Sequence, residues 1–305
     1  MSETLRGGVI GAGVFGGHHA RKYANLPGVR LSAVLDPHPT RAATLAVPLG
    51  GRAFTELDEF LEAVDVVTVA SPAQFHAEQA LAALKAGKPV YIEKPIAISV
   101  ADAEAVQAEA ARRGLVVACG HQERVLFDAM GLFDIPERPL RLEAVRHGTP
   151  SDRSLDVSVV LDLMIHDLDL ALALSHAEAV TAEGEGADAG SGSWDIANAE
   201  VTFDTGFVAE FSVSRRAEVR SRKMRISYPS GELEIDFLTR EFRNTTGYPL
   251  NPGFADTPQA QDTLATSVSA FLDAVRGELP RPIVDAGDAA RALDLALAVE
   301  QGLSG

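Results

Sequence analysis

The sequence is poor in cysteine and has no long apolar run. Its single cysteine, Cys119, excludes a disulfide within the chain. No apolar stretch approaches the length that spans a bilayer. The first residues, from Met1 to Thr4, lack the basic flank and apolar core of a secretory signal. We therefore expect a cytoplasmic protein with no membrane partner.

Positive charge is also scarce. The chain has 27 Lys and Arg residues against 43 Asp and Glu residues, a formal net charge of −16. Such a chain repels the phosphate backbone of nucleic acids, so we expect no nucleic-acid partner. With 305 residues, 46% of them hydrophobic and 23% charged, the chain is long enough for two folded domains.

The first part of the chain alternates short apolar runs with helical patterns. The runs that predict strands lie at residues 9–10, 31–35, 64–70, 90–92 and 116–118. The patterns that predict helices lie at residues 18–26, 39–46, 74–86 and 99–113. Continuous Val, Ile and Ala runs are typical of parallel strands buried on both faces. The sequence therefore predicts an α/β domain with a parallel sheet over residues 1–120.

The pattern changes after residue 120. Alternating strands are predicted at residues 140–146, 197–203, 207–214, 223–228 and 232–237, and helices at 123–132, 156–175, 263–276 and 286–301. Alternation of this kind is typical of antiparallel strands. Residues 184–193, rich in Gly, Ser and Ala, predict a flexible surface loop. We expect an α+β domain over residues 121–305, with its last helix free to pack back on the first domain.

A glycine loop follows the first predicted strand and opens a helix. Gly11 permits the tight turn, Gly13 lets a pyrophosphate approach the backbone, and Gly16 allows close packing of helix and strand. Asp36 ends the next strand, where its carboxylate can accept hydrogen bonds from a ribose and repel a 2′-phosphate. Arg41 lies close enough in sequence to weaken that discrimination. This setting predicts a dinucleotide site that prefers NAD over NADP.

A charged pair ends the predicted strand at residues 90–92. Glu93 and Lys94 come directly after it, and Pro95 then turns the chain. Ligands of an open parallel sheet bind at the carboxyl ends of its strands, so Lys94 is expected in the binding crevice. The alternative is that this pair only caps a strand at the surface.

Asp162 and His166 lie four residues apart in the helix predicted at 156–175. At this spacing both side chains share one helical face. Oxidation of a secondary alcohol needs a base for the hydroxyl proton, and His166 can supply it. Asp162 would orient the substrate or tune the imidazole. The alternative is a buried structural histidine beside a capping aspartate.

Together these motifs resemble the Gfo/Idh/MocA oxidoreductases. The resemblance covers essentially the whole chain and includes the glycine loop, Asp36, Glu93-Lys94-Pro95 and the segment from Asp162 to Asp169. It implies a Rossmann domain followed by an α+β domain with an open, mostly antiparallel sheet, often used for oligomerisation. It also implies that Asp162 and His166 face the nicotinamide. Three further positions, Ser71, Pro72 and His76, are implied near the nicotinamide ribose.

The substrate class depends on two weaker features. Glu123 and Arg124, at the domain junction, resemble a motif of nucleotide-sugar dehydrogenases, although Val125-Leu126-Phe127 replaces the Phe-Asn-Pro that we would expect there. Six basic residues also cluster in a short stretch. They are Arg215, Arg216, Arg220, Arg222, Lys223 and Arg225. Guanidinium groups of this kind could bind a pyrophosphate, or they could pair with acidic residues along a strand.

We therefore predict an NAD-dependent oxidoreductase that acts on a sugar-type secondary alcohol, with a nucleotide sugar such as UDP-N-acetylglucosamine as the leading substrate. A free cyclitol, aldose or sugar acid is the alternative substrate, and a non-catalytic NAD-binding regulator is the alternative function. We expect a homodimer or homotetramer and no metal ion. Lys94, Asp162 and His166 are the predicted catalytic residues, joined in substrate binding by Glu123 and Arg124. The predicted cofactor-binding residues are Gly11, Gly13, Val14, Phe15, Gly16, Asp36, Arg41, Ser71, Pro72, His76, Glu93 and Lys94.

Overall fold

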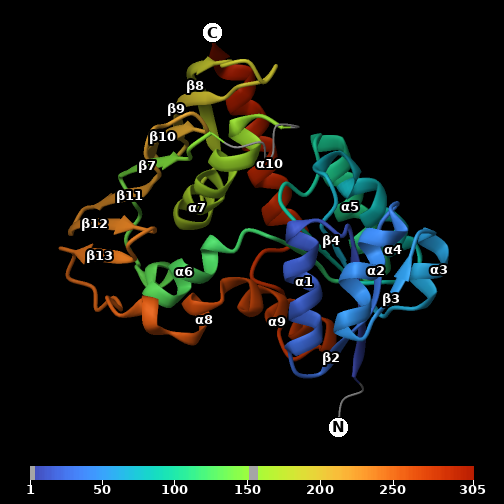
Figure 1. Cartoon of the computed structure of the whole chain (residues 1–305). Helices are drawn as coiled ribbons and strands as arrows, with labels where there is room; N and C mark the ends of the chain where they lie inside the picture. The colour runs from blue at the N-terminus through green and yellow to red at the C-terminus, as the bar shows by residue number, and fades with distance from the viewer. Residues whose placement is uncertain (1–3, 151–156) are drawn as a thin grey trace. The chain divides into compact units, whose positions relative to one another are not determined.

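The computed structural model describes residues 4–150 and 157–305 (Figure 1). Contacts divide the chain into two compact units. The first comprises Met1–Gln122 and Asp262–Ala290, and the second comprises Glu123–Gln261 and Arg291–Gly305. The sequence placed the change of pattern at residue 120 and left 262–290 with the later part of the chain. The start of the helix predicted at residues 156–175 lies outside the described residues.

A six-stranded parallel sheet forms the centre of the first unit, as the sequence predicts. Its order is β3-β2-β1-β4-β5-β6. The strands are β1 (Leu5–Ile10), β2 (Val29–Leu35), β3 (Arg52–Phe54), β4 (Val66–Val69), β5 (Val90–Ile92) and β6 (Val117–Cys119). The order reverses between β1 and β4, and the crevice at such a reversal is where doubly wound sheets bind dinucleotides.

Helices connect these strands. They are α1 (Val14–Asn25), α2 (Pro39–Ala46), α3 (Leu57–Glu62), α4 (His76–Lys85) and α5 (Val100–Arg113), with short 3₁₀ turns at Val47–Leu49 and Ala73–Phe75. Two of these elements, β3 and α3, are not predicted from the sequence, because a strand of three residues and a helix of six are too short to show a period. The α5 helix begins with a side-chain cap, in which Ser99 Oγ accepts from the backbone N–H of Asp102.

The α9 helix (Thr263–Arg276) returns to the first unit and completes its core. Phe271 is fully buried and meets the ring of Tyr91 edge to face, with ring centroids 5.9 Å apart. Ser267 lies 3.0 Å from the same tyrosine hydroxyl. Burying an aromatic side chain of this size stabilises a core by several kcal/mol. This packing accounts for the assignment of residues 262–290 to the first unit.

An eight-stranded mixed sheet forms the centre of the second unit, with the order β13-β12-β11-β7-β10-β9-β8-β14. Most neighbours are antiparallel, while β7 with β10 and β8 with β14 are parallel. The strands are β7 (Arg141–His147), β8 (Ala179–Ala187), β9 (Ile196–Phe203), β10 (Val208–Ser214), β11 (Ser221–Tyr228), β12 (Gly231–Asp236), β13 (Glu241–Asn244) and β14 (Leu303–Ser304). The predicted fold class is confirmed in both units.

One prediction for this sheet was wrong. Residues 184–187, expected in a flexible loop, belong to β8, which pairs with β9. A Cβ atom on Gly184 would lie 2.1 Å from the Asn198 carbonyl oxygen, and one on Gly186 would lie 2.7 Å from the Trp194 ring. Glycine is therefore present here because neighbouring groups approach closely, and not because the chain forms a loop.

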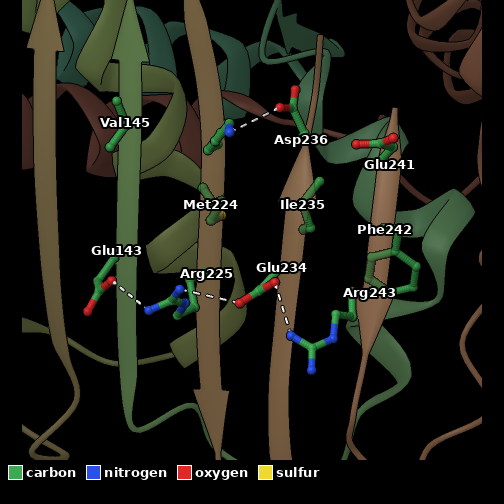
Figure 2. Close-up of a pocket in the computed structure, with 11 residues that line it drawn as sticks. Glu143, Val145, Met224, Arg225, Glu234, Ile235, Asp236, Glu241, Phe242 and Arg243 are labelled. Carbon is green, nitrogen blue, oxygen red and sulfur yellow. Dashed lines mark hydrogen bonds and ion pairs between the residues drawn. The ribbon is translucent and has the colours of Figure 1, made fainter. Parts of the chain in front are cut away.

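The two faces of this sheet differ. Its inner face carries Leu142, Ala144 and Arg146 of β7, which are all buried. The outer face carries charged side chains that pair across β7, β11, β12 and β13 (Figure 2). The helices of the unit are α6 (Glu123–Met130), a π-helical turn at Val160–Met164 that leads into α7 (Ile165–Ser175), α8 (Pro258–Gln261) and the later part of α10 (Ala286–Gly302). Within the two described ranges, no helix is both long and apolar enough to cross a bilayer.

Candidate active site

The glycine loop leaves an open surface between β1 and α1. Gly11 has φ +97°, and a Cβ atom there would lie 2.7 Å from the Ala70 carbonyl oxygen. A Cβ atom on Gly16 would lie 1.8 Å from the Gly11 carbonyl oxygen, whereas one on Gly13 would meet nothing within 4 Å. Gly11 and Gly16 are therefore needed for local packing, and the space beside Gly13 is available to a ligand.

The start of α1 is suited to an anionic ligand. Gly13 precedes the helix and provides no side-chain cap for its first N–H groups. Val14 and Phe15 follow, and they are 58% and 51% exposed. Unpaired N–H groups at a helix start bind phosphate, and the exposed apolar side chains beside them provide contact surface for a bound cofactor.

Asp36 supports the same loop from the end of β2. One carboxylate oxygen accepts the backbone N–H of Ala12 at 2.9 Å, and the other accepts that of His38 at 2.9 Å. Asp36 is buried, whereas Arg41 is exposed in α2. Each carboxylate oxygen has a second lone pair, so these two bonds leave capacity for ribose hydroxyls. The carboxylate thus positions the glycine loop through Ala12. It also lies at the end of β2, where the ribose of the cofactor is predicted to bind.

His76 joins two loops of the first unit. Its Nε2 lies 2.8 Å from the Ser71 carbonyl oxygen and its Nδ1 lies 2.7 Å from the Pro95 carbonyl oxygen. A neutral imidazole has one N–H and can donate to only one of these oxygens, whereas the protonated ring donates to both. His76 is 2% exposed, while Pro72 at the same loop is exposed. The geometry favours a positioning role for His76 over direct contact with the ribose.

Glu93 is turned into the protein. Its Oε1 lies 2.6 Å from His19 Nε2 and accepts from Gln122 Nε2 at 3.3 Å. Burial opposes ionisation, yet the hydrogen bond from His19 and the positive charges of His19, Lys94 and His76 outweigh it and lower the pKa of Glu93. This anion anchors the segment between β5 and α5, so the geometry favours a positioning role here too.

Lys94 stands at the end of this anchored segment. It is partly exposed, its neighbours Glu93 and Pro95 are buried, and its peptide bond to Pro95 is cis. Its backbone is fixed on both sides, because Glu93 pairs with His19 and the Pro95 carbonyl lies against His76. The strand end therefore presents the lysine at the carboxyl edge of the sheet, as predicted from the sequence.

In the second unit, Asp162 and His166 share one partly exposed strip of a helix that is otherwise buried. Between residues 158 and 172 only Asp162, Leu163 and His166 are partly exposed. Asp162 lies in the π-helical turn and His166 lies in the first turn of α7. Single π-helical turns recur at functional sites, because the widened backbone re-aims side chains. The structure thus presents these two residues together, although the sequence had predicted a regular helix.

A buried ion-pair network stands behind His166. Its Nδ1 lies 2.8 Å from Glu123 Oε2. Glu123 Oε1 accepts from one Nη of Arg146 at 2.9 Å, and Arg146 also forms a two-pronged pair with Asp167 at 2.9 and 2.7 Å. Burial opposes both charges, but the network overcomes it, so the pKa of Glu123 lies well below its usual range and that of Arg146 is raised. We call Asp167, Arg146, Glu123 and His166 the histidine network.

Arg124 pairs with Asp169, which is not a member of the histidine network. Its Nε and one Nη donate to the two oxygens of Asp169 at 2.8 and 2.6 Å, and both residues are buried. A paired guanidinium of this kind positions α6 against α7. The geometry therefore favours a structural role for Arg124 over the predicted contact with substrate, and Glu123 acts on His166 directly.

The basic cluster separates into groups with different partners. Arg215 is buried and Arg216 is exposed, and each has a nitrogen 3.4 Å from an oxygen of Asp195. Lys223 lies 3.7 Å from Asp236 on the outer face of the sheet, where Arg225 is also found. Among these residues, Arg222 alone projects from β11 onto the inner face. Density of charge along the sequence thus does not correspond to one binding surface.

Three residues that support the predicted site residues are not predicted from the sequence. They are His19, Arg146 and Asp167. A signal existed for Asp167, because an acidic residue in an apolar helix must be buried with a cation or else exposed. Nothing in the spacing could have selected Arg146 or His19 as the partners, since each contact joins distant parts of the chain.

Comparisons with known proteins are consistent with this geometry. Residues 5–121 match the oxidoreductase family with an NAD-binding Rossmann fold, and residues 140–234 match the GFO/IDH/MocA C-terminal domain. The chain is 37% identical to UDP-N-acetylglucosamine 3-dehydrogenase of Acidithiobacillus ferrooxidans, over 97% of each chain. A solved structure with that name and organism has a TM-score of 0.90 and 35% identity, covering 98% of this chain and 97% of that one. Inositol 2-dehydrogenase of Corynebacterium glutamicum is 41% identical, but over only 32% of this chain and 30% of that protein.

Replacing Asp36 tests its predicted discrimination between the two dinucleotides. Asp36→Asn should weaken the binding of NAD, because one oxygen is lost, and should ease the repulsion of a 2′-phosphate. We expect the ratio of kcat/KM for NADP to that for NAD to rise by about tenfold or more. Asp58→Asn, at an exposed acid in α3, is the matched control. An unchanged ratio in Asp36→Asn would remove Asp36 from the ribose.

Proposed function

Because this chain belongs to the Gfo/Idh/MocA family of NAD-dependent oxidoreductases, we propose that it oxidises the 3-hydroxyl of UDP-N-acetylglucosamine or a closely similar nucleotide sugar. The observation that carries this proposal is the likeness to a UDP-N-acetylglucosamine 3-dehydrogenase, which extends over 97% of both chains. The inositol dehydrogenase likeness covers about a third of the chain, so it supports the cofactor domain more than the substrate.

The reaction removes a hydride from carbon and a proton from oxygen, which converts the secondary alcohol to a ketone. NAD, when bound, supplies the acceptor for the hydride. We assign the proton to His166, which would accept it at Nε2 because its Nδ1 faces Glu123 at 2.8 Å. A carboxylate at Nδ1 favours the tautomer with its proton there, so that the lone pair of Nε2 is available to the substrate.

Glu123 has a second function in this proposal. When His166 takes the proton it becomes a cation, and the buried carboxylate stabilises that charge. Arg146 keeps Glu123 in place by donating to it at 2.9 Å, and Asp167 in turn holds Arg146 through a hydrogen bond of 2.7 Å. Glu123 and Arg146 are therefore positioning residues, and His166 is the base.

We also assign roles in the reaction to Lys94 of the first unit and Asp162 of the second. Lys94 would donate to the reacting oxygen and stabilise negative charge that develops there. Asp162 shares the partly exposed strip with His166 and would accept hydrogen bonds from a neighbouring sugar hydroxyl. Their anchoring supports these roles, because each side chain projects from a buried and hydrogen-bonded backbone.

The assigned activity can be tested together with Lys94. The wild-type protein should reduce NAD in the presence of UDP-N-acetylglucosamine and give the 3-keto product, with much slower turnover of myo-inositol and glucose. Lys94→Met should lower kcat by about a hundredfold or more while NADH still binds, because the donor to the reacting oxygen is lost and the glycine loop is unchanged. Lys85→Met, in the exposed last turn of α4, is the control. Turnover of myo-inositol instead of the nucleotide sugar would reassign the substrate to a free cyclitol, and full activity in Lys94→Met would reject the assigned site.

Glu123→Gln tests the histidine network. The amide no longer stabilises a positive charge on His166, so kcat should fall by about a hundredfold or more while the affinity for NADH is unchanged. The charge contacts hold the pKa of Glu123 well below the usual carboxyl range, so this contribution is present at neutral pH and is lost only as pH falls through that lowered value. Glu143→Gln, on the outer face of the sheet, is the matched control. A KM effect without a kcat effect in Glu123→Gln would place Glu123 in substrate binding alone.

We also propose that the protein forms a homo-oligomer through the outer face of the second sheet. This face carries a hollow of about 530 Å³, crossed by ion pairs that join Glu143, Arg225, Glu234 and Arg243 over 3.3 to 3.7 Å (Figure 2). Isolated exposed pairs contribute little to the stability of one chain. Light scattering at micromolar concentration should give the mass of a dimer or tetramer, and a monomer mass would contradict this proposal.

A further inference from the structure

Arg222 occupies an unusual position on β11. In the antiparallel pairing of β11 with β7, Arg222 lies directly opposite Arg146. Side chains of directly paired residues project from the same face, so both arginines belong to the inner face of the sheet. The neighbouring basic residues Lys223 and Arg225 both lie on the outer face, where each pairs with an acidic residue.

These two arginines lie opposite each other on neighbouring strands, but they differ in the acidic partners of their side chains. Arg146 is surrounded by Asp167 and Glu123, with hydrogen bonds between 2.7 and 2.9 Å. Arg222 is partly buried and forms no ion pair or side-chain hydrogen bond within residues 4–150 and 157–305. Burial lowers the pKa of Arg222, as do the nearby charges of Arg146 and Arg220, and they outweigh the opposing effect of the carboxylates of Glu123 and Asp167.

Like charges placed opposite each other on a sheet face are destabilising. Here the cost is increased because one cation is fully buried and the other is partly withdrawn from water. A partly buried guanidinium with unused donors recognises carboxylate or phosphate oxygens. Glu123 and Asp167 accept hydrogen bonds from Arg146 and act on Arg222 through their charge alone, so within the described residues the donors of Arg222 have no acceptor and can take an anion.

This position is connected to the proposed base through the histidine network. A continuous series of contacts leads from His166 to Glu123 over 2.8 Å and from Glu123 to Arg146 over 2.9 Å, and Arg222 is the cross-strand partner of Arg146. All four residues belong to the second unit. One extended ligand can therefore place an anionic group at Arg222 and a hydroxyl at His166.

We propose that Arg222 is the anion-recognising residue of the substrate site and binds the diphosphate of a nucleotide sugar. This proposal rests on the proposed function for the location of the reacting hydroxyl. Arg220, exposed two residues earlier, adds positive charge to the same region. Arg215 and Arg216 have no such role, because Asp195 and backbone carbonyls engage them.

The test compares two arginines of one strand that face opposite sides of the sheet. UDP, UDP-N-acetylglucosamine and inorganic pyrophosphate are titrated by calorimetry into NADH-saturated wild type, Arg222→Gln and Arg225→Gln. We expect Arg222→Gln to bind UDP and UDP-N-acetylglucosamine about ten- to a hundredfold more weakly, because charge-assisted hydrogen bonds are lost. Arg225→Gln should stay within about twofold of the wild type. Arg222→Lys should recover part of the affinity, since it restores the charge without the planar fork.

The NADH affinity of each variant reports whether its cofactor domain is intact, and circular dichroism reports whether its second unit is folded. Equal binding of UDP by Arg222→Gln and wild type would overturn the proposal, as would an equal loss in Arg225→Gln. Glucuronate and glucose 6-phosphate are titrated in parallel as other anionic ligands. If their binding depends on Arg222 and the binding of UDP does not, the diphosphate assignment is overturned.

The proposed oxidation can fail independently of this inference. UDP-N-acetylglucosamine that binds through Arg222 but is not oxidised would reject the 3-dehydrogenase function and support the anion site. Oxidation that is equally efficient in Arg222→Gln and wild type would support the function and reject Arg222.

Discussion

The second unit depends on the ion pairs that neutralise one buried cation, the guanidinium of Arg146. Arg146 is 3% exposed, and its position on a central strand would be untenable without Asp167 and Glu123. Removing both acids would leave a buried charge without a partner, at a cost on the order of 3–5 kcal/mol. Because Glu123 also faces His166, the interaction that permits the sheet to form fixes the imidazole as well. Stability and orientation of the base therefore have one physical origin.

The first unit solves a similar problem with different groups. Lys94 follows a strand of three residues, which by itself could not hold a side chain accurately. Glu93 is paired with His19, and His76 lies against the carbonyls of Ser71 and Pro95. Buried polar contacts on both sides of the lysine restrict its backbone, while its amine remains partly exposed. In both units the residues assigned to chemistry are few, and most conspicuous polar residues near them serve as supports.

Local sequence features predicted what depends on local structure. The glycine loop, the strand before Glu93 and the helical spacing of Asp162 and His166 follow from short-range sterics and periodicity, and the fold class followed from them. The partners of Glu123 and Arg124 could not be predicted, because Arg146 and Asp169 come from other elements. Residues 184–187 of β8 failed for a related reason, since alternating Glu and Gly resembles a loop until the neighbouring strand that requires glycine is known.

Charge along the chain illustrates why a cluster in sequence is a poor guide to a site. A strand sends alternate residues to opposite faces, so Arg222 and Arg225 experience different surroundings although they are three residues apart. On the outer face each cation has acidic neighbours and water, and its charge is compensated cheaply. On the inner face the same charge stands opposite a buried arginine, and the nearby carboxylates of Glu123 and Asp167 accept their hydrogen bonds from Arg146. A basic residue therefore indicates an anion-binding site where its side-chain donors have no acceptor in the protein. In the described part of β11 that condition is met at Arg222.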